Sequence, residues 1–85
     1  MCDEWYVYLV KCNDNTLYCG ITIDIARRVE EHNNSSRGAK YTHSRRPVEL
    51  VYNEGPYSKQ IALRREFVIK GMSRINKLAL TNSTH

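Results

Sequence analysis

The sequence contains no long hydrophobic run, because no stretch stays apolar for the roughly 18 residues that a membrane-spanning helix needs. Its first ten residues, MCDEWYVYLV, lack the basic cluster and long apolar segment of a secretory signal peptide. Internal repeats, linkers and low-complexity segments are absent as well. We therefore expect one folded domain over residues 1–85, located in the cytoplasm without membrane contact, with a frayed tail at about 81–85.

Cysteine is scarce, and its placement excludes a class of small folds. The three cysteines, Cys2, Cys12 and Cys19, are odd in number and show no CxxC spacing. This argues against a disulfide framework and agrees with a reducing compartment. No spacing typical of zinc ligands links these thiols to His32 or His43, so we rank a zinc site below small buried thiols.

Size and charge limit the remaining choices. Eighty-five residues, 41% hydrophobic and 26% charged, make a small globular domain with a modest core. Thirteen Lys and Arg against nine Asp and Glu leave a formal charge of +4. This balance favours polyanionic partners such as nucleic acids but does not identify one. The composition does not indicate an oligomeric state.

The apolar pattern predicts three strands and three helices. Clusters of aromatic and β-branched residues predict strands at 5–12, 16–22 and 47–54. Helical periodicity and caps predict helices at about 24–33 and 59–70, then a short one capped by Ser73. The order β-β-α-β-α-α predicts an α/β fold of the α+β kind, a small three-stranded antiparallel sheet flanked by helices.

The first two predicted strands form a hairpin around the turn sequence NDN. A three-residue loop would pair Cys12 with Thr16 and would set Tyr8 diagonally to Tyr18 on one face of the sheet. A two-residue loop would put the tyrosines on opposite faces. The register therefore decides whether the two side chains can share a site.

The phase of the first predicted helix separates two neighbouring arginines. At about 100° per residue, Arg27 and Glu31 face away from the buried stripe, which is defined by Ile25 and Val29. Arg28 and His32 stack four residues apart along the border of that stripe. We expect Arg27 to be solvated and Arg28 to lie against the sheet.

The second predicted helix carries two charged residues near its apolar side. The expected core arc consists of Ile61, Ala62, Val68, Ile69 and Met72. Glu66 lies just beyond this arc, where a partly desolvated carboxylate needs an arginine, a metal ion or backbone donors. Arg65 projects into the arc, where either its stem packs and its guanidinium reaches water, or it pairs with a carboxylate.

A polar segment, NNSSRGAKYTHSRR, connects the first helix to the third strand. It offers four cations and one aromatic ring, from Arg37, Lys40, Tyr41, Arg45 and Arg46. Cations mixed with an aromatic ring are typical of surfaces that bind nucleic acids. We name residues 33–46 the polar loop and predict that it contacts DNA.

Two half-motifs of the predicted hairpin resemble those of the GIY-YIG nuclease family. The first is YVY, with Tyr6 where the family often has glycine and Tyr8 as its tyrosine. The second is YCG, which begins at Tyr18, ten residues after Tyr8. The resemblance covers nearly the whole chain and is closest to the small bacterial branch that consists of this domain alone.

The rest of the family pattern follows in order. Arg28 falls eight residues after Gly20, where the family has its catalytic arginine, and His32 comes one helical turn later. Glu66 matches the metal-binding glutamate. Each tripeptide alone would be a weak signal, but five positions in the right order make the resemblance specific.

The resemblance implies a metal-dependent endonuclease that hydrolyses phosphodiester bonds of duplex, branched or single-stranded DNA, in repair or recombination. Tyr18 would be the general base or orient the water, with Tyr8 supporting it. Arg28 would hold the phosphate, and His32 would assist proton transfer or bind phosphate with a charge that switches near neutrality. Glu66 would hold one Mg²⁺ or Mn²⁺.

Every one of these residues also has an ordinary structural explanation. Tyrosines are common on strands, Arg28 could pair with Glu31 or Glu66, and His32 could pack at the helix end. The alternative function is a catalytically silent nucleic-acid-binding module of the same fold that uses the polar loop. A protein-interaction adaptor leaves the polar cluster unexplained. Because all five residues agree with the family pattern together, we favour the nuclease.

Overall fold

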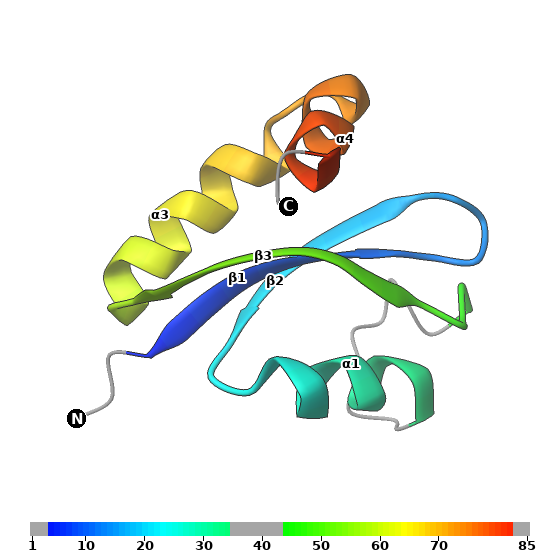
Figure 1. Cartoon of the computed structure of the whole chain (residues 1–85), viewed down its shortest axis with the longest axis horizontal. Coiled ribbons are helices and arrows are strands. Elements are labelled where there is room, and N and C mark those ends of the chain that lie inside the picture. Colours follow the sequence, from blue (N-terminus) through cyan, green and yellow to red (C-terminus); the bar gives the residue numbers. More distant parts are fainter. Residues whose placement is uncertain (1–3, 35–43, 83–85) are drawn as a thin grey trace.

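Three antiparallel strands form one sheet in the order β2-β1-β3 in the computed structural model, which describes residues 4–34 and 44–82. The strands are β1 (Trp5–Lys11), β2 (Leu17–Thr22) and β3 (Glu49–Tyr57), and the helices are α1 (Ile25–Asn34), α3 (Lys59–Lys70) and α4 (Arg74–Asn82). Helix α1 covers one face of the sheet, and α3 and α4 cover the other (Figure 1). The predicted element order and antiparallel sheet are confirmed.

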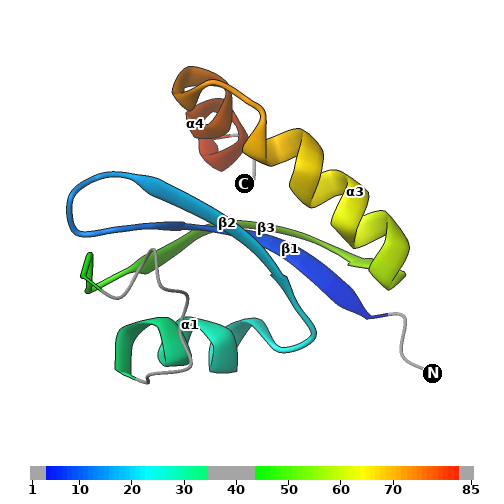
Figure 2. The ribbon, with the colours of Figure 1, turned by 180° about the vertical axis from the view of Figure 1, so that it is seen from behind.

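Strand β1 lies in the centre of the sheet and is covered on both faces. On the α3 side the buried cluster consists of Val7, Leu9, Cys19, Ala62 and Ile69. On the α1 side it consists of Tyr8, Val10, Cys12 and Val48. The reverse view in Figure 2 shows the same two layers of helices around the sheet. A strand enclosed in this way needs apolar side chains on both faces, which explains the uninterrupted run WYVYLV.

The hairpin has the three-residue loop that brings the tyrosines together. Backbone N of Cys12 donates to the carbonyl of Thr16 at 2.8 Å, and Tyr8 lies directly opposite Gly20 in the β1–β2 ladder. Tyr18, two residues before Gly20, therefore lies on the same face as Tyr8, in the predicted diagonal position.

Capping residues fix the predicted helix ends. A side-chain oxygen accepts a hydrogen bond from the first turn of each helix, from Asp24 for α1, Ser58 for α3 and Ser73 for α4. Helix α4 runs to Asn82, so the first two residues of the tail expected to fray are helical. Within the described part of the chain, no helix is long and apolar enough to cross a membrane.

The rotation of α3 differs from the one that its apolar pattern predicts. Ala62 and Ile69 are fully buried, but Ile61 and Val68 are 46% and 49% exposed. Arg65 is half-buried on the side of α3 that faces the sheet, as expected, and of its two predicted alternatives it adopts the pairing with a carboxylate. The predicted core arc is therefore wrong for Ile61 and Val68.

Glu54 on β3 explains this rotation. Two nitrogens of Arg65, Nε and Nη2, donate to the two carboxylate oxygens of Glu54 at 2.5 and 2.9 Å. The hydroxyls of Tyr52 and Tyr57 donate to the same carboxylate. The Arg65 hydrogen bonds are the main cause that holds the pKa of Glu54 below its usual range. This paired fork turns Arg65 toward the sheet and leaves Ile61 and Val68 on the outside.

Tyr8 approaches the backbone of Gly20 so closely that a side chain at position 20 would collide with it. A Cβ at position 20 would lie 2.5 Å from Tyr8 Oη and 2.8 Å from its Cζ. We expect Gly20→Ala to displace the tyrosine and to lower the free energy of unfolding in urea by roughly 1–3 kcal/mol.

Gly71 supplies the matched control for this substitution. A Cβ at Gly71 would meet its nearest atoms at 3.6 Å, and the residue already has a φ of −80°. Gly71→Ala should therefore change the free energy of unfolding by no more than roughly 0.5 kcal/mol. Equal stability of the two variants would show that Tyr8 does not depend on the space at Gly20.

Candidate active site

Four of the predicted catalytic residues meet on the α1 face of the sheet. Tyr8 Oη lies 2.7 Å from His32 Nε2, and both side chains are buried. The ring of Tyr18 meets the imidazole edge-on, with 5.3 Å between the ring centroids. Arg28 is near enough to Tyr8 to lower the pKa of the phenol in opposition to burial. The hairpin register and the phase of α1 together produce this cluster.

The hydrogen bonds in the cluster have a direction. Arg28 has only donors, so its guanidinium favours electron density on the phenol oxygen of Tyr8 and cannot accept the phenol hydrogen. We assign the single phenol hydrogen to His32 Nε2, which accepts it in the neutral imidazole. Burial raises the pKa of Tyr8 to about 12 against the opposing influence of Arg28, so Tyr8 keeps its proton at neutral pH. Tyr8 therefore links Arg28 to His32 and is not itself a base.

His32 is fully buried, and its charge does not switch near neutrality. Burial, with the nearby positive charge of Arg28, lowers its pKa to about 4. The prediction that His32 changes its charge near neutral pH is wrong. Helix phase alone placed His32 at the border of the buried stripe, but the rings of Tyr8 and Tyr18 pack against the imidazole and bury it. A neutral imidazole without exposed surface contacts Tyr8 and is closed off from solvent.

The two neighbouring arginines differ as predicted. The side chain of Arg27 is 69% exposed and that of Arg28 is 27% exposed. Glu31 was expected to face solvent with Arg27, but it is only 16% exposed, with its oxygens 3.3 Å from Arg27 Nε and 2.9 Å from Arg28 Nη1. The hydrogen bond from Arg28 is the main cause that lowers the pKa of Glu31. Glu31 thus helps to orient Arg28.

The last turn of α1 is hydrogen-bonded to the residues just before β3, a contact that the sequence did not predict. Val48 N donates to Asn33 Oδ1 at 2.7 Å, and Asn33 Nδ2 donates back to Val48 O at 3.1 Å. Arg46 Nε donates to the carbonyl of His32 at 2.5 Å. No sequence rule connects Asn33 to a backbone group 15 residues away. These bonds hold the turn that carries His32.

The predicted nucleic-acid contacts are only partly within the described residues. Arg37, Lys40 and Tyr41 lie outside them. Arg45 Nε lies 3.0 Å from Asp14 Oδ2 in the hairpin turn, and Arg46 caps α1. Both described arginines therefore also have structural contacts within the domain.

Glu66 approaches β2 from the other face of the sheet. It lies on α3, its side chain is 18% exposed, and Lys70 Nζ is 3.2 Å from its Oε2. Burial raises the pKa of Cys19 to about 12, and the charge of Glu66 adds to this rise. Cys19 faces α3, whereas its neighbour Tyr18 faces α1. The predicted residues therefore lie on both sides of the edge strand β2.

The residues around Glu66 fit a hard divalent ion. Among the described residues, no three His, Cys, Asp or Glu side chains gather as a metal site. One carboxylate nevertheless suffices for Mg²⁺ or Mn²⁺, which keep most of their waters and take other oxygens from substrate. The protonated thiol of Cys19 is unsuited to compete as a ligand. Glu66 is the residue that would hold such an ion.

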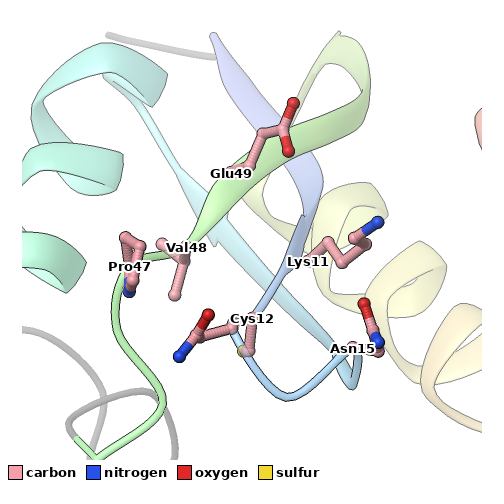
Figure 3. Close-up of a pocket in the computed structure, with 7 residues that line it drawn as sticks. Lys11, Cys12, Asn15, Pro47, Val48 and Glu49 are labelled. Carbon is pink, nitrogen blue, oxygen red and sulfur yellow. The ribbon is translucent and has the colours of Figure 1, made fainter.

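A hollow of about 270 Å³ lies between the hairpin turn and the start of β3 (Figure 3). Its lining residues are Lys11, Cys12, Asn13, Asn15, Pro47, Val48 and Glu49. It contains none of the predicted catalytic residues, so the candidate site is the side-chain cluster and not this hollow.

The low pKa of His32 predicts how stability depends on pH. The unfolded chain takes up a proton near pH 6.5, whereas the folded protein resists it until about pH 4. The free energy of unfolding, measured in urea, should therefore fall as the pH is lowered through this interval, by up to about 3 kcal/mol.

His32→Gln should lack this slope, although its overall stability should be lower because the packing of His32 is lost. The upper half of the interval is informative because carboxyl groups of the unfolded chain are still ionised there. Parallel pH profiles for wild type and His32→Gln would contradict the assignment of a neutral, buried His32.

Comparisons with known proteins identify the family of this fold. The family model of the GIY-YIG catalytic domain matches residues 4–79. The UPF0213 protein DP2720 of Desulfotalea psychrophila is 51% identical over 80 residues, which cover 94% of this chain and 73% of that protein. The UPF0213 protein SSP2268 of Staphylococcus saprophyticus is 53% identical over 78 residues, with 92% and 94% covered.

A solved structure shows the same fold. The solution NMR structure of the UPF0213 protein BH0048 from Bacillus halodurans has 40% sequence identity and a TM-score of 0.61, covering 95% of this chain and 85% of that chain. The family match spans both half-motifs, Arg28 and Glu66. This chain belongs to the GIY-YIG catalytic domain family.

Proposed function

We propose that this protein is an endonuclease that hydrolyses DNA phosphodiester bonds with the help of Mg²⁺ or Mn²⁺. The observation that carries the proposal is the cluster in which Tyr8 is hydrogen-bonded to His32 and lies under the influence of the Arg28 charge, beside Tyr18, in a chain of the GIY-YIG family. A tyrosine that only packs on a strand does not require a buried imidazole and a nearby arginine as polar partners. The cluster holds a charged donor at a fixed place next to a second tyrosine.

Each residue of the cluster has a role in hydrolysis, which requires an activated water and stabilisation of charge on the phosphate. Tyr18 is half-buried and not sealed like Tyr8, so we assign to it the activation or orientation of the water. Arg28 presents a partly exposed guanidinium, which can bind two phosphate oxygens. Tyr8 and His32 are positioning residues for Arg28 and Tyr18.

Glu66 is assigned the metal ion. A bound Mg²⁺ or Mn²⁺ would stabilise negative charge on the phosphate and the leaving oxygen. Glu66 serves this purpose because its carboxylate is close to the edge strand that carries Tyr18, and because its partner Lys70 is half-exposed and can move away. Its neighbour Arg65 is occupied by Glu54 and does not neutralise it.

The polar loop is assigned the contact with the rest of the DNA, through the five residues predicted from its sequence. We further propose that the protein acts in the cytoplasm on DNA during repair or recombination. A panel of duplex, nicked, branched and single-stranded DNA with Mg²⁺ or Mn²⁺ tests this substrate class. The alternative, a catalytically silent binding module, would bind members of the panel without cleaving any of them.

Arg28 and Arg27 provide a matched pair of variants. Arg28→Ala should lower the cleavage rate by roughly 100-fold or more, because a charge-stabilising donor at the phosphate is lost. Arg27→Ala, on the exposed side of the same helix, should weaken binding by about one phosphate contact and reduce the salt dependence accordingly. Equal losses of cleavage in both variants would contradict the assignment of Arg28.

Glu66→Gln separates metal binding from stability. Its ion pair with Lys70 is half-exposed, so removal of the charge should change the free energy of unfolding by less than about 1 kcal/mol. Cleavage and Mn²⁺ binding, the latter measured by calorimetry, should both be lost.

Glu30→Gln is the control for this experiment, because Glu30 is an exposed glutamate on α1. It should retain wild-type cleavage and Mn²⁺ binding. A Glu66→Gln protein that cleaves at the wild-type rate would refute the metal role of Glu66.

A further inference from the structure

The outer side of α3 carries most of the apolar residues of that helix. Four large hydrophobic side chains are exposed there, at 45% for Leu63, 46% for Ile61, 49% for Val68 and 81% for Phe67. Isolated exposed hydrophobic residues are ordinary, but four on one short helix form a patch that is typical of an interaction site. We name Ile61, Leu63, Arg64, Phe67 and Val68 the outer face of α3.

The two helices above the sheet also carry the net positive charge of the protein. Residues 59–82 contain six Lys and Arg and one Glu, a charge of +5. The remainder of the chain contains seven Lys and Arg and eight Asp and Glu, a charge of −1. The apolar patch therefore lies within a strongly basic segment of the sequence, as the polar loop also is, and its complement is an anionic partner.

Phe67 is placed between cations on the helix surface. Residues three or four positions apart are neighbours on a helix, so Leu63, Arg64 and Lys70 surround Phe67. Arg64 is exposed, and the side chain of Lys70 is 52% exposed. An exposed ring beside an arginine is the combination on which a base stacks while its phosphate binds the cation.

A second copy of this chain fits the patch less well. Two such faces would bring two basic helix pairs together, with Glu66 as the sole acidic residue of each pair. Like charges across an interface oppose association. A nucleic-acid strand supplies both negative charge and flat apolar groups, so it matches the charge and the ring at once.

We propose that the outer face of α3 binds a single strand of nucleic acid, with a base stacked on Phe67 and a phosphate on Arg64. Helix α3 lies on the opposite side of the sheet from α1 (Figure 1), the helix that carries Arg28 and His32, so this surface would hold a part of the strand away from the bond to be cleaved. The inference rests on the proposed function only in taking nucleic acid as the partner.

Fluorescence anisotropy with a labelled oligothymidylate and a labelled duplex tests the proposal. Phe67→Ala should weaken single-strand binding roughly fivefold or more, since one stacked base is lost, and should affect the duplex less. Arg64→Glu should weaken binding most at low salt and should flatten the salt dependence.

Two substitutions elsewhere serve as controls. Ile23→Ala removes a hydrophobic side chain that is 53% exposed outside α3, and Lys11→Glu reverses an exposed charge on β1. Both should bind the oligothymidylate like wild type. Thermal unfolding of Phe67→Ala should match wild type, because the ring is 81% exposed.

Unchanged affinity in Phe67→Ala and Arg64→Glu would overturn the inference. So would a wild-type dimer in sedimentation that Phe67→Ala dissociates without a change in DNA affinity, because the patch would then bind a second copy. Cleavage by Arg28→Ala, measured in parallel, separates the two proposals. If Arg28→Ala loses cleavage while Phe67→Ala and Arg64→Glu bind DNA like wild type, the proposed nuclease function is supported and this inference fails. If Phe67→Ala weakens DNA binding but the wild-type protein cleaves no DNA, this inference is supported and the proposed nuclease function fails.

Discussion

The contact between Tyr8 and Gly20 is the constraint on which the α1 side of the molecule depends. Because position 20 has no Cβ, the phenol can lie flat against β2, and its hydroxyl is then removed from water. A desolvated hydroxyl needs a partner, and His32 is that partner. The bond fixes the rotation of α1, and the same rotation turns Arg28 toward the sheet and Arg27 away from it. The absence of a side chain at Gly20 thus determines which arginine of α1 faces the sheet.

The parts of the fold that the sequence predicts are those governed by local rules. Turn length determines the hairpin register, and capping residues such as Asp24 and Ser58 determine where helices begin. Helix phase also separates Arg27 from Arg28, since both belong to one regular element. The site cluster could be anticipated because it combines these local rules with the spacing of a known family.

The parts that the sequence does not predict depend on contacts between distant elements. The rotation of α3 is determined by Glu54, 11 residues before Arg65 and on a strand, so the apolar periodicity of α3 alone gives the wrong face for Ile61 and Val68. The burial of His32 results from two tyrosines on separate strands closing over it. The helix pattern places Arg65 in the core arc and allows it to pair with a carboxylate, but it does not identify Glu54 as the partner or show that this pair displaces Ile61 and Val68.

The position of β2 at the edge of the sheet has a consequence for how this domain can be built into larger proteins. Tyr18 projects from one face of β2, and Glu66 lies over the other face. Under the proposed function, a scissile phosphate therefore has to approach across the outer border of that strand. A further strand paired with β2 would cover this approach. Under the proposed function, extra domains or chains that extend the sheet would therefore have to attach at β3 or at the helices, so that the outer border of β2 stays accessible to DNA.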